Sequence, residues 1–445
     1  MKNIRKKSFT FFKEVLSTIV NNQQIFKSFG SWKKTNDNFS IHDLIVNVEK
    51  AKDEVSAEFY SNLLMEKVET LKEEELNDFF VLLSEEYEIN SKELQNSLNK
   101  YNLNRSPENL SKIIDDSEPR RVEIFRRMNL SERGTIRLVK LREKLINLIN
   151  HKPNFKRVDN DLLKLFKSWF NPGFLVLKRI NWETPAHILE KIIKYESVHE
   201  IKSWRDLRDR VEPKDRLCFA FFHPAMIDEP LIFVQVALMK KIPNKIKQVL
   251  ATDREIITQN DASSAIFYSI SNCQRGLTGV SFGNFLIKQV ANEIKNEISH
   301  IDNFATLSPI PGLMKWLEKN HKELFNRIKL NPPQKNSNVF ERKLLEIAIE
   351  YFSHSTRVDK LPNDPVARFH LGNGAIIDGI HFLADESKKG ISQSAGLMVN
   401  YKYDLNKIEQ NHESFFNDSK VVFSDIFKSK LSEKIKISPN KNKNL

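Results

Sequence analysis

The most informative part of the chain is Asn272–Val290, NCQRGLTGVSFGNFLIKQV, because it joins three structural signals in one run. Before it, Ala265–Ile270 is apolar and rich in β-branched and aromatic residues, as a buried strand should be. Gly276 and Gly279 bracket a tight turn, and apolar residues then recur at helical spacing. The run therefore predicts a strand, a glycine turn and a helix in succession.

A turn of this kind is suited to a phosphate group. The first N–H groups of a helix have no partner within the helix, and the helix dipole favours an anion there. The glycines Gly276, Gly279 and Gly283 would let a pyrophosphate approach the main chain, and Arg275 and Lys288 can add positive charge. The same spacing also occurs in ordinary strand-to-helix turns, so both interpretations stay open on the motif alone.

Length and composition indicate a two-domain globular protein. The chain has 445 residues, of which 40% are hydrophobic and 29% charged. No apolar run approaches the ~18 residues needed to cross a bilayer, so we do not expect a membrane protein.

The chain is basic, with 70 Lys and Arg residues against 58 Asp and Glu residues and a formal net charge of +12. This balance fits a phosphate-rich ligand or a polyanionic partner. The basic residues are spread along the chain, with no arginine-rich arm, zinc-ligand spacing or aromatic RNA-binding signature. We therefore expect neither a nucleic-acid partner nor a bound metal.

Cysteine usage and the termini suggest a cytoplasmic protein. Cys218 and Cys273 lie at or near predicted buried strands, so packing is expected rather than a disulfide. The first sixteen residues, MKNIRKKSFTFFKEVL, are basic like a transit peptide but lack a secretory core and a small-residue cleavage site. We interpret them as a surface helix.

The first part of the chain, residues 1–160, is predicted to be all-helical. Its apolar residues recur three and four apart among many Glu and Lys residues, and glycine is nearly absent. Basic pairs such as Arg120-Arg121 and Arg126-Arg127 fit a solvated helix face. With no catalytic cluster, this domain is expected to serve assembly or support. The expected helices include Ile41–Ala57, Phe59–Glu74, Leu76–Tyr87, one from Pro107 after a Ser106 cap, and Thr135–Asn150.

The second part, residues 161–445, is predicted to be a mixed α/β domain. Besides the strand before the turn, it has strands expected at Gly173–Leu177, Arg216–Phe222, Pro230–Leu238 and Phe304–Leu307, and a helix running to Tyr195 after a Thr184 cap. This order, with a phosphate-binding turn after the central strand, resembles the acyl-CoA-binding N-acetyltransferase (GNAT) fold. In that fold the turn reads Gln/Arg-x-x-Gly-x-Gly/Ala. Gly276–Ser281 is a degenerate version of it.

Several segments also resemble the malonyl-CoA decarboxylase family. They follow the family's order and cover most of the chain from about residue 120 onward. The segments are Arg126–Leu130 (RRMNL), Trp169–Leu175 (WFNPGFL), Phe221–Pro224 (FFHP), Glu229–Val234 (EPLIFV), Ala265–Ser271 (AIFYSIS), Leu307–Gly312 (LSPIPG), Asp364–Ala375 (DPVARFHLGNGA) and Ser394–Tyr403 (SAGLMVNYKY).

This resemblance implies a helical N-terminal domain, a GNAT-like catalytic domain, and conversion of malonyl-CoA to acetyl-CoA and CO2 without a metal or organic cofactor. It also implies a homo-oligomer, a dimer or tetramer. The family's catalytic serine and histidine fall on Ser308 and His370, and an active-site tyrosine falls on Tyr403.

The resemblance places malonyl-CoA binding on the turn. The binding run covers Thr278, Gly279, Val280, Ser281, Phe282, Gly283 and Asn284. Some family members, notably animal ones, carry glutamate where this chain has Ser281. A serine hydroxyl at a helix start can still cap the helix or meet a phosphate.

Each candidate residue also has a structural explanation. His370 suits proton delivery because its unperturbed pKa of ~6.5 is near working pH, but a lone histidine is commonly structural. Ser308 could orient the malonyl carboxylate or relay a proton, or could simply belong to a turn. Tyr403 could be core packing, and His223 a turn residue. Asn373, in a Gly-Asn-Gly loop, could bring its amide to the ligand.

Two other functions fit parts of the pattern. A CoA-dependent acyltransferase would use the same fold and would release free CoA only when an amine acceptor is present. A non-catalytic acyl-CoA sensor would combine the turn with a basic helical domain that binds nucleic acid, and its binding would depend on salt. The Ser308 and His370 motifs together favour the decarboxylase.

Overall fold

The computed structural model describes residues 39–434, apart from 150, 281, 283–284 and 335–337. They form two compact units. The helical unit runs up to Val176 and also includes the segments Phe222–Glu229 and Gln274–Ser281. The sheet unit holds Leu177–Phe221, Pro230–Cys273 and the chain from Phe282 onward.

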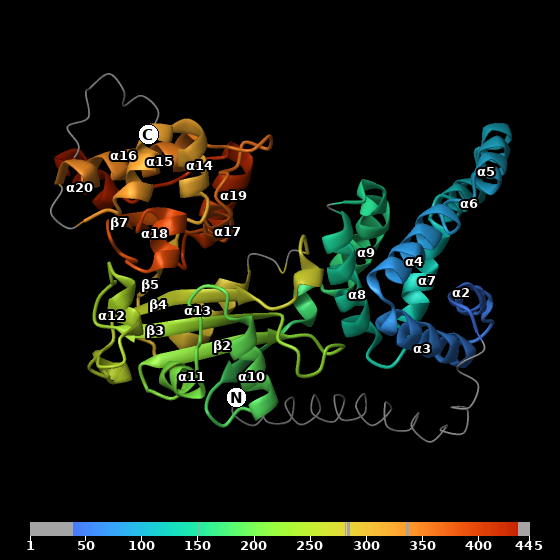
Figure 1. Ribbon diagram of the computed structural model, residues 1–445, viewed down its shortest axis with the longest axis horizontal. Helices are drawn as coiled ribbons and strands as arrows, with labels where there is room; N and C mark the ends of the chain where they lie inside the picture. Colours follow the sequence, from blue (N-terminus) through green and yellow to red (C-terminus); the bar gives the residue numbers. More distant parts are fainter. Residues whose placement is uncertain (1–38, 150, 281, 283–284, 335–337, 435–445) are drawn as a thin grey trace. The chain divides into compact units, whose positions relative to one another are not determined.

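The described residues before Phe170 form helices and no strand, as the sequence predicts (Figure 1). Serine caps the helix that begins at Pro107, as expected, because the Ser106 side chain accepts a hydrogen bond from the Asn109 N–H. The helices are α2 (Ile41–Lys50), α3 (Glu54–Thr70), α4 (Glu73–Glu85), α5 (Ser91–Leu103), α6 (Pro107–Asp116), α7 (Arg120–Met128), α8 (Gly134–Ile149) and α9 (Lys156–Trp169).

The single helix expected over Ile41–Ala57 is wrong, since the chain forms two helices there. Helix α2 ends at Lys50, and Asp53 starts α3 by accepting a hydrogen bond from the Ser56 N–H at 2.8 Å. Asp is a strong N-cap, and its side chain competes with continuation of the preceding helix.

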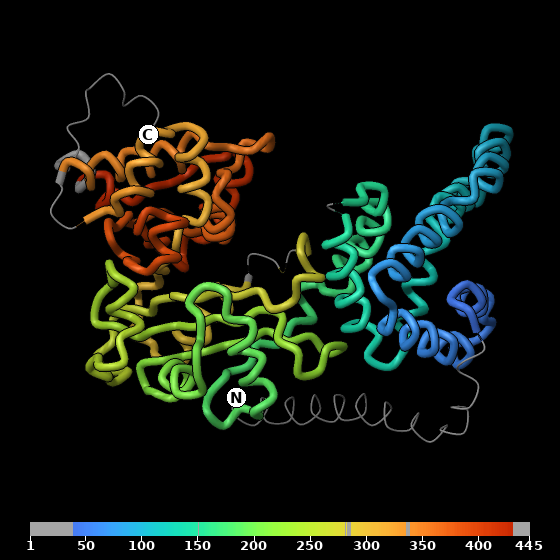
Figure 2. Tube along the Cα trace, in the orientation of Figure 1, coloured from blue at the N-terminus to red at the C-terminus, as the bar shows by residue number. Residues whose placement is uncertain are grey.

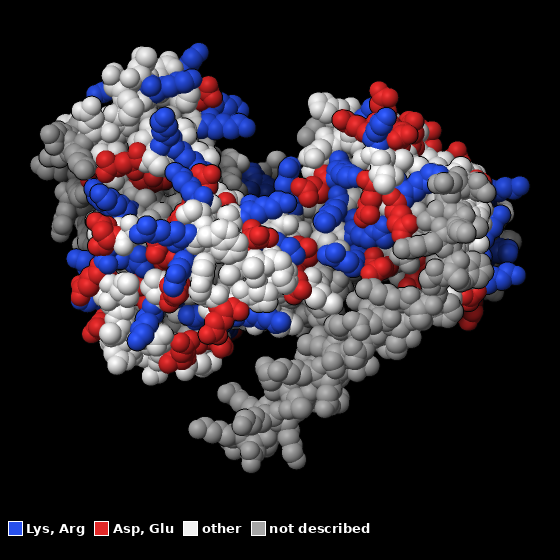
Figure 3. Space-filling view, turned by 60° about the horizontal axis from the view of Figure 1, so that its bottom comes forward, with Lys and Arg blue, Asp and Glu red and all other residues white. Residues whose placement is uncertain are grey.

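The basic pairs of α7 are not simply a solvated face. The Arg121 side chain is 1% exposed and forms ion pairs with Asp161 and Glu88 at 2.8 and 2.9 Å. Arg127 donates to the carbonyl oxygens of three residues at the end of α2, which are Val48, Glu49 and Ala51. These two arginines therefore hold the helices of the unit together. Other charges are mixed in sign over the face drawn in Figure 3.

The sheet has eight strands among the described residues, in the order β1-β2-β3-β4-β5-β8-β6, with β7 paired to β8. Strands β4 and β5 pair in parallel, whereas β2-β3, β3-β4, β5-β8, β6-β8 and β7-β8 are antiparallel. The strands are β1 (Val176–Ile180), β2 (Arg216–Phe222), β3 (Ile232–Met239), β4 (Ser264–Asn272), β5 (Asn303–Thr306), β6 (Ser308–Pro309), β7 (Ile376–His381) and β8 (Met398–Tyr403).

The predicted fold class, a helical domain followed by a mixed α/β domain of the GNAT type, is confirmed. Within the sheet unit, helices α14 to α20 gather around β7 (Figure 1). The helices are α10 (Ala186–Tyr195), α11 (Trp204–Val211), α12 (Ile246–Leu250), α13 (Phe285–Glu297), α14 (Leu313–Asn320), α15 (Lys322–Leu330), α16 (Asn338–His354), α17 (Pro365–Gly372), α18 (Lys388–Ser394), α19 (Ile408–Asp418) and α20 (Asp425–Lys434).

Two local predictions in this part are wrong. The first strand begins at Val176 rather than Gly173, because Pro172–Phe174 forms a 3-10 turn in which the Asn171 side chain accepts from the Gly173 N–H. Thr184 does not cap α10. Its hydroxyl oxygen instead accepts from the Asn181 N–H, in a turn that precedes the helix.

The central strands of the sheet are buried on both faces. Every residue of β2 is buried, as is all of β3 except Met239. Cys218 and Cys273 are both buried, as expected of packing residues. No helix among the described residues is long and apolar enough to span a membrane.

Candidate active site

Ser308, His370 and Tyr403 form one hydrogen-bonded chain inside the sheet unit. The His370 Nε2 atom lies 3.1 Å from the Ser308 Oγ atom, and the His370 Nδ1 atom lies 2.8 Å from the Tyr403 Oη atom. The three residues are 7%, 3% and 1% exposed. The structure thus brings together the three residues that the sequence singled out, with the histidine in the middle.

Two neighbouring strands and one helix supply these side chains. Ser308 opens β6 and pairs with Val399 of β8, while Tyr403 ends β8 and pairs with Phe304 of β5. His370 lies in the last turn of α17, not in the loop beyond it. The serine and tyrosine positions are therefore fixed by strand register, and the histidine position by helix α17.

Asp364 ties the start of α17 to the turn that follows Ser308. Its Oδ1 atom accepts from the N–H groups of Val366 and Ala367 at 3.0 and 2.9 Å, which caps the helix. Its Oδ2 atom accepts from the Gly312 N–H at 3.2 Å. Burial raises the pKa of this carboxyl group. One aspartate therefore anchors both segments that carry the serine and the histidine.

Burial determines the protonation states of His370 and Tyr403. It lowers the pKa of His370 from 6.5 to about 3 and raises the pKa of Tyr403 well above 10.0. His370 and Tyr403 are therefore both neutral at neutral pH. In the protein without ligand, His370 is therefore far from its unperturbed pKa of 6.5, because no charged group compensates the desolvation of the imidazolium.

Thr306 and Tyr401 complete the surroundings. Ser308 Oγ donates to Thr306 Oγ1 at 3.0 Å, and Thr306 Oγ1 also accepts from the Tyr401 N–H at 3.2 Å. The Tyr401 ring stacks on the His370 ring, with centroids 4.6 Å apart and planes inclined by 25°. The Tyr401 hydroxyl is buried and has no hydrogen-bond partner among the described residues. Tyr401 therefore contacts His370 through its ring alone.

Asn373 follows α17 and has part of its amide already occupied. Its Nδ2 atom donates to the Phe369 carbonyl oxygen at 2.6 Å, while its Oδ1 atom is buried with no partner in the described parts of the chain. The side chain can therefore offer a ligand its amide oxygen as an acceptor.

The glycine turn belongs to the helical unit, where it packs on α8 (Figure 2). Residues Arg275–Leu277 form a 3-10 turn. A Cβ atom on Gly276 would lie 1.9 Å from the Val139 carbonyl oxygen, so only glycine allows this approach. The structure therefore gives Gly276 a packing role, beside the ligand role that remains a prediction.

Arg142 of α8 holds the turn. Its Nη1 atom donates to the carbonyl oxygens of Gly276 and Thr278 at 2.6 and 2.9 Å. Asp159 of α9 accepts from the same guanidinium at 2.7 and 3.3 Å. The Arg142 side chain is 3% exposed. A buried, bidentate arginine thus fixes the path of two peptide groups in the turn.

The other predicted turn residues are placed as follows. Gly279 has φ of 86°, which favours glycine, and Thr278 donates its hydroxyl to the Arg275 carbonyl oxygen. Arg275 is exposed and contacts Asn147 of α8. The Val280 N–H donates to the Leu277 carbonyl oxygen, and Phe282 is buried. Ser281, Gly283 and Asn284 lie outside the described residues.

Lys288 and His223 have partners that bear on their roles. Lys288 pairs with Glu409 at 2.5 Å. The His223 Nδ1 atom accepts from the Ala225 N–H at 3.1 Å, and the ring lies 4.9 Å from that of Phe170. Burial lowers the pKa of His223. These contacts describe a turn histidine within the helical unit.

Sequence reasoning missed Arg142, Thr306 and Tyr401. Tyr401 could have been found, because it is two residues before Tyr403 on the same strand and so shares its face. Thr306 likewise precedes Ser308 by two residues. Arg142 had no local signal, since its partners Gly276 and Thr278 are 134 and 136 residues away.

No group of three His, Cys, Asp or Glu side chains among the described residues is arranged to hold a metal ion. The chemistry available at the site is that of hydroxyl, imidazole and phenol groups. Such groups donate hydrogen bonds and move protons.

The fold and the buried serine and histidine define a GNAT-like enzyme with a helical N-terminal domain. Two family models match the chain: the malonyl-CoA decarboxylase N-terminal domain at residues 87–170 and the C-terminal domain at residues 173–441. The chain belongs to the malonyl-CoA decarboxylase family and is an enzyme of that family.

Individual relatives agree. The mitochondrial malonyl-CoA decarboxylases of Anser anser anser and Rattus norvegicus are 34% and 32% identical to it over 346 residues, covering 69% of this chain and 68% and 70% of theirs. Crystal structures of malonyl-CoA decarboxylase from Rhodopseudomonas palustris and Agrobacterium vitis superpose with TM-scores of 0.83 and 0.82 at 42% identity. They cover 86% and 87% of this chain and 97% and 98% of their own.

Proposed function

We propose that this protein decarboxylates malonyl-CoA to acetyl-CoA and CO2 by way of an enolate. The observation that carries the proposal is the buried Ser308–His370–Tyr403 chain in a member of this family. In the reaction, the bond between the malonyl carboxylate and the α-carbon breaks. Its electron pair forms the thioester enolate, and one proton is added to the α-carbon.

His370 is the proposed source of that proton. Desolvation alone holds its pKa at about 3. A malonyl carboxylate bound beside it would be an opposite charge in a buried site, and such a charge favours the imidazolium and raises the pKa. Binding of the substrate would then be accompanied by uptake of a proton on His370. The imidazolium would be available when the enolate forms.

Ser308 stands between His370 and the substrate in this proposal. Because His370 Nε2 lies within hydrogen-bond distance, the serine hydroxyl can pass the proton from the imidazolium to the α-carbon. It can alternatively hold the carboxylate while His370 acts directly. Tyr403 bonds the other ring nitrogen and would keep the imidazole in one orientation.

The turn is the proposed site for the phosphates of malonyl-CoA. Unpartnered backbone N–H groups at the start of a helix attract phosphate, and Gly279 in the left-handed region shapes the backbone for it. We assign substrate binding to Arg275, Gly276, Thr278, Gly279, Val280, Ser281, Phe282, Gly283 and Asn284, with His223 and Asn373 as further contacts.

We also propose that the protein is a cytoplasmic homo-oligomer, a dimer or tetramer, without a nucleic-acid partner. Residues 1–160 would mediate self-association and residues 161–445 would bind and convert acyl-CoA. Amphipathic helices without catalytic candidates support this division. Light scattering at micromolar concentration tests it, and a monomer there would count against it.

Turnover is the direct test of the activity. Purified protein is incubated with malonyl-CoA, and acetyl-CoA and CO2 are measured together. Ser308→Ala should lose most activity, whereas Ser392→Ala, an exposed serine on α18, should not. Folded wild-type protein that forms no acetyl-CoA would refute the proposal.

A further inference from the structure

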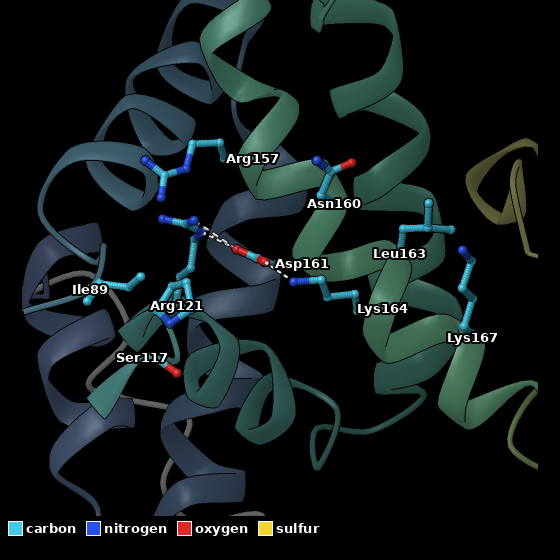
Figure 4. A pocket seen from close by; sticks show the side chains of 10 residues that line it. Ile89, Ser117, Arg121, Arg157, Asn160, Asp161, Leu163, Lys164 and Lys167 are labelled. Carbon is cyan, nitrogen blue, oxygen red and sulfur yellow. Dashed lines mark hydrogen bonds and ion pairs between the residues drawn. The ribbon is translucent and has the colours of Figure 1, made fainter. Parts of the chain in front are cut away.

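A basic cavity of about 380 Å³ lies on the surface of the helical unit (Figure 4). Four basic side chains and one carboxylate line it, along with apolar and neutral groups. The charged residues are Arg121, Arg157, Asp161, Lys164 and Lys167. The cavity is therefore suited to an anion, provided that nearby carboxylates do not already pair with all of its basic side chains.

The carboxylates at the cavity are already occupied by arginines. Asp161 is bound by the buried Arg121 at 2.8 Å, and Glu88 pairs with both Arg121 and Arg157 at 2.9 and 3.1 Å. Lys164 reaches Asp161 only at 3.9 Å. These contacts leave lysine charge available to a ligand.

Helical spacing places the available groups on one face of α9. Leu163 and Lys164 lie three and four residues after Asn160, and Lys167 lies three and four residues after Lys164 and Leu163, as neighbours on a helix surface do. Neither the Asn160 side chain nor the Lys167 side chain has a hydrogen bond or ion pair to a described residue. Lys167 projects on the same side of α9 as Leu163 (Figure 4).

The same face adjoins the glycine turn. A Cβ atom placed on Gly279 would lie 3.4 Å from the Leu163 side chain, so the cavity wall and the turn are in van der Waals reach. Both belong to the helical unit. An acyl-CoA whose pyrophosphate lies at the turn has one further phosphate, on the ribose 3′ oxygen, to place nearby.

We infer that the cavity binds the 3′-phosphate of acyl-CoA, with Lys164 and Lys167 supplying charge and Asn160 a hydrogen bond. The inference rests on the proposed function, because it takes malonyl-CoA as the ligand of the turn. It provides a binding site for the 3′-phosphate, which the glycine turn does not account for. It also gives the helical unit a direct part in substrate binding.

Calorimetry with CoA and 3′-dephospho-CoA tests the inference, because these two probes differ only in the phosphate concerned. Wild-type protein should bind CoA more tightly. The double variant Lys164→Gln/Lys167→Gln should weaken CoA binding by about tenfold, as two exposed ion pairs would, while binding of 3′-dephospho-CoA stays the same. Lys156→Gln, an exposed residue of α9 outside the cavity, should leave both affinities unchanged.

Two results would overturn it. One is a double variant that still prefers CoA as strongly as the wild type does. The other is an equal loss of affinity for CoA and 3′-dephospho-CoA, which would mean that the lysines act on the pyrophosphate or only through long-range electrostatic attraction. Turnover of malonyl-CoA, measured on the same protein, separates this from the proposed function: an active enzyme with either result keeps the function and loses the cavity.

Discussion

The Nε2 atom of His370 and the Oγ atom of Ser308 lie 3.1 Å apart, although 62 residues separate them in the chain. The contact is supported by Asp364, which caps the histidine's helix and accepts from the Gly312 N–H just after the serine. The pair is thus held by a structural carboxylate that does not itself contact either side chain.

If Ser308 and His370 act as a unit, removing either should have the same cost. We expect Ser308→Ala and His370→Asn each to lower kcat by ~10² to 10⁴-fold, with a smaller effect on malonyl-CoA binding. The double variant should be scarcely slower than either single variant. Steady-state kinetics measures all three. Losses that multiply would instead assign Ser308 to orienting the carboxylate.

Tyr403→Phe and Tyr401→Phe form a matched pair. The first change removes the hydroxyl bound to His370 Nδ1 and leaves that ring nitrogen buried without a partner, so we expect kcat to fall by about tenfold or more. The second removes a hydroxyl with no partner and keeps the ring that stacks on His370. Its kcat should be nearly normal. Equal losses in both would show that the tyrosine hydroxyl is not what positions His370.

Stability should decline in mild acid because of His370. Its pKa is about 3 in the folded protein and about 6.5 in the unfolded chain, so the unfolded chain binds the proton first as pH falls. The contribution of the neutral His370 to the free energy of unfolding is complete above pH ~6.5 and is lost as pH falls from there through ~3. Between pH 7 and 5 the free energy of unfolding should drop by about 2 kcal/mol from this residue.

Denaturant titrations at several pH values measure this slope. His370→Asn should flatten it, and the exposed His151→Asn should not. His199, whose pKa burial lowers to about 4, adds to the decline in the same direction. A slope unchanged by His370→Asn would mean that the imidazole is not neutral in the folded protein.

Arg142 should affect substrate affinity although it is not predicted to touch the ligand. Arg142→Lys cannot reproduce the bonds to Gly276, Thr278 and Asp159 together, so the turn should lose its fixed path. We expect a loss of about 3 kcal/mol in stability and a raised KM for malonyl-CoA, with kcat less affected. Lys140→Ala, exposed on the same helix, is the control. An unchanged KM in folded Arg142→Lys would separate the turn from substrate binding.

Gly276 and Gly173 should differ sharply in their tolerance of alanine. At Gly276 the added Cβ would lie 1.9 Å from the Val139 carbonyl oxygen, which is backbone and cannot easily move. At Gly173 the nearest atom is 3.4 Å away, an ordinary contact. Thermal denaturation should therefore show a clear loss for Gly276→Ala and little for Gly173→Ala. A tolerated Gly276→Ala would contradict the close packing of the turn on α8.

Elements with strong periodicity could be predicted from the sequence. The strand over Arg216–Phe222 is confirmed with the same bounds, because its continuous apolar run matches a strand buried on both faces. Helix boundaries were less certain. The break at Asp53 was missed because a cap signal lay inside an otherwise helical pattern.

The candidate site could likewise be predicted only in part. The sequence singled out Ser308, His370 and Tyr403 through a family resemblance, and the structure places them in contact. Their protonation could not be predicted, since the pKa of His370 depends on how completely the fold removes water around it. The buried environment of Arg121 and Arg142 was also hidden, because their partners are distant in sequence.

Arg142 and the glycine turn belong to one structural unit although 134 residues separate Arg142 from Gly276. The family models divide the chain between residues 170 and 173, yet the turn around Gly276 takes its shape from a helix before that division. A fragment starting at residue 173 would keep the turn and lose its guanidinium. The arginine on one side of that division and the glycine on the other therefore have to be present together for the turn to keep this shape.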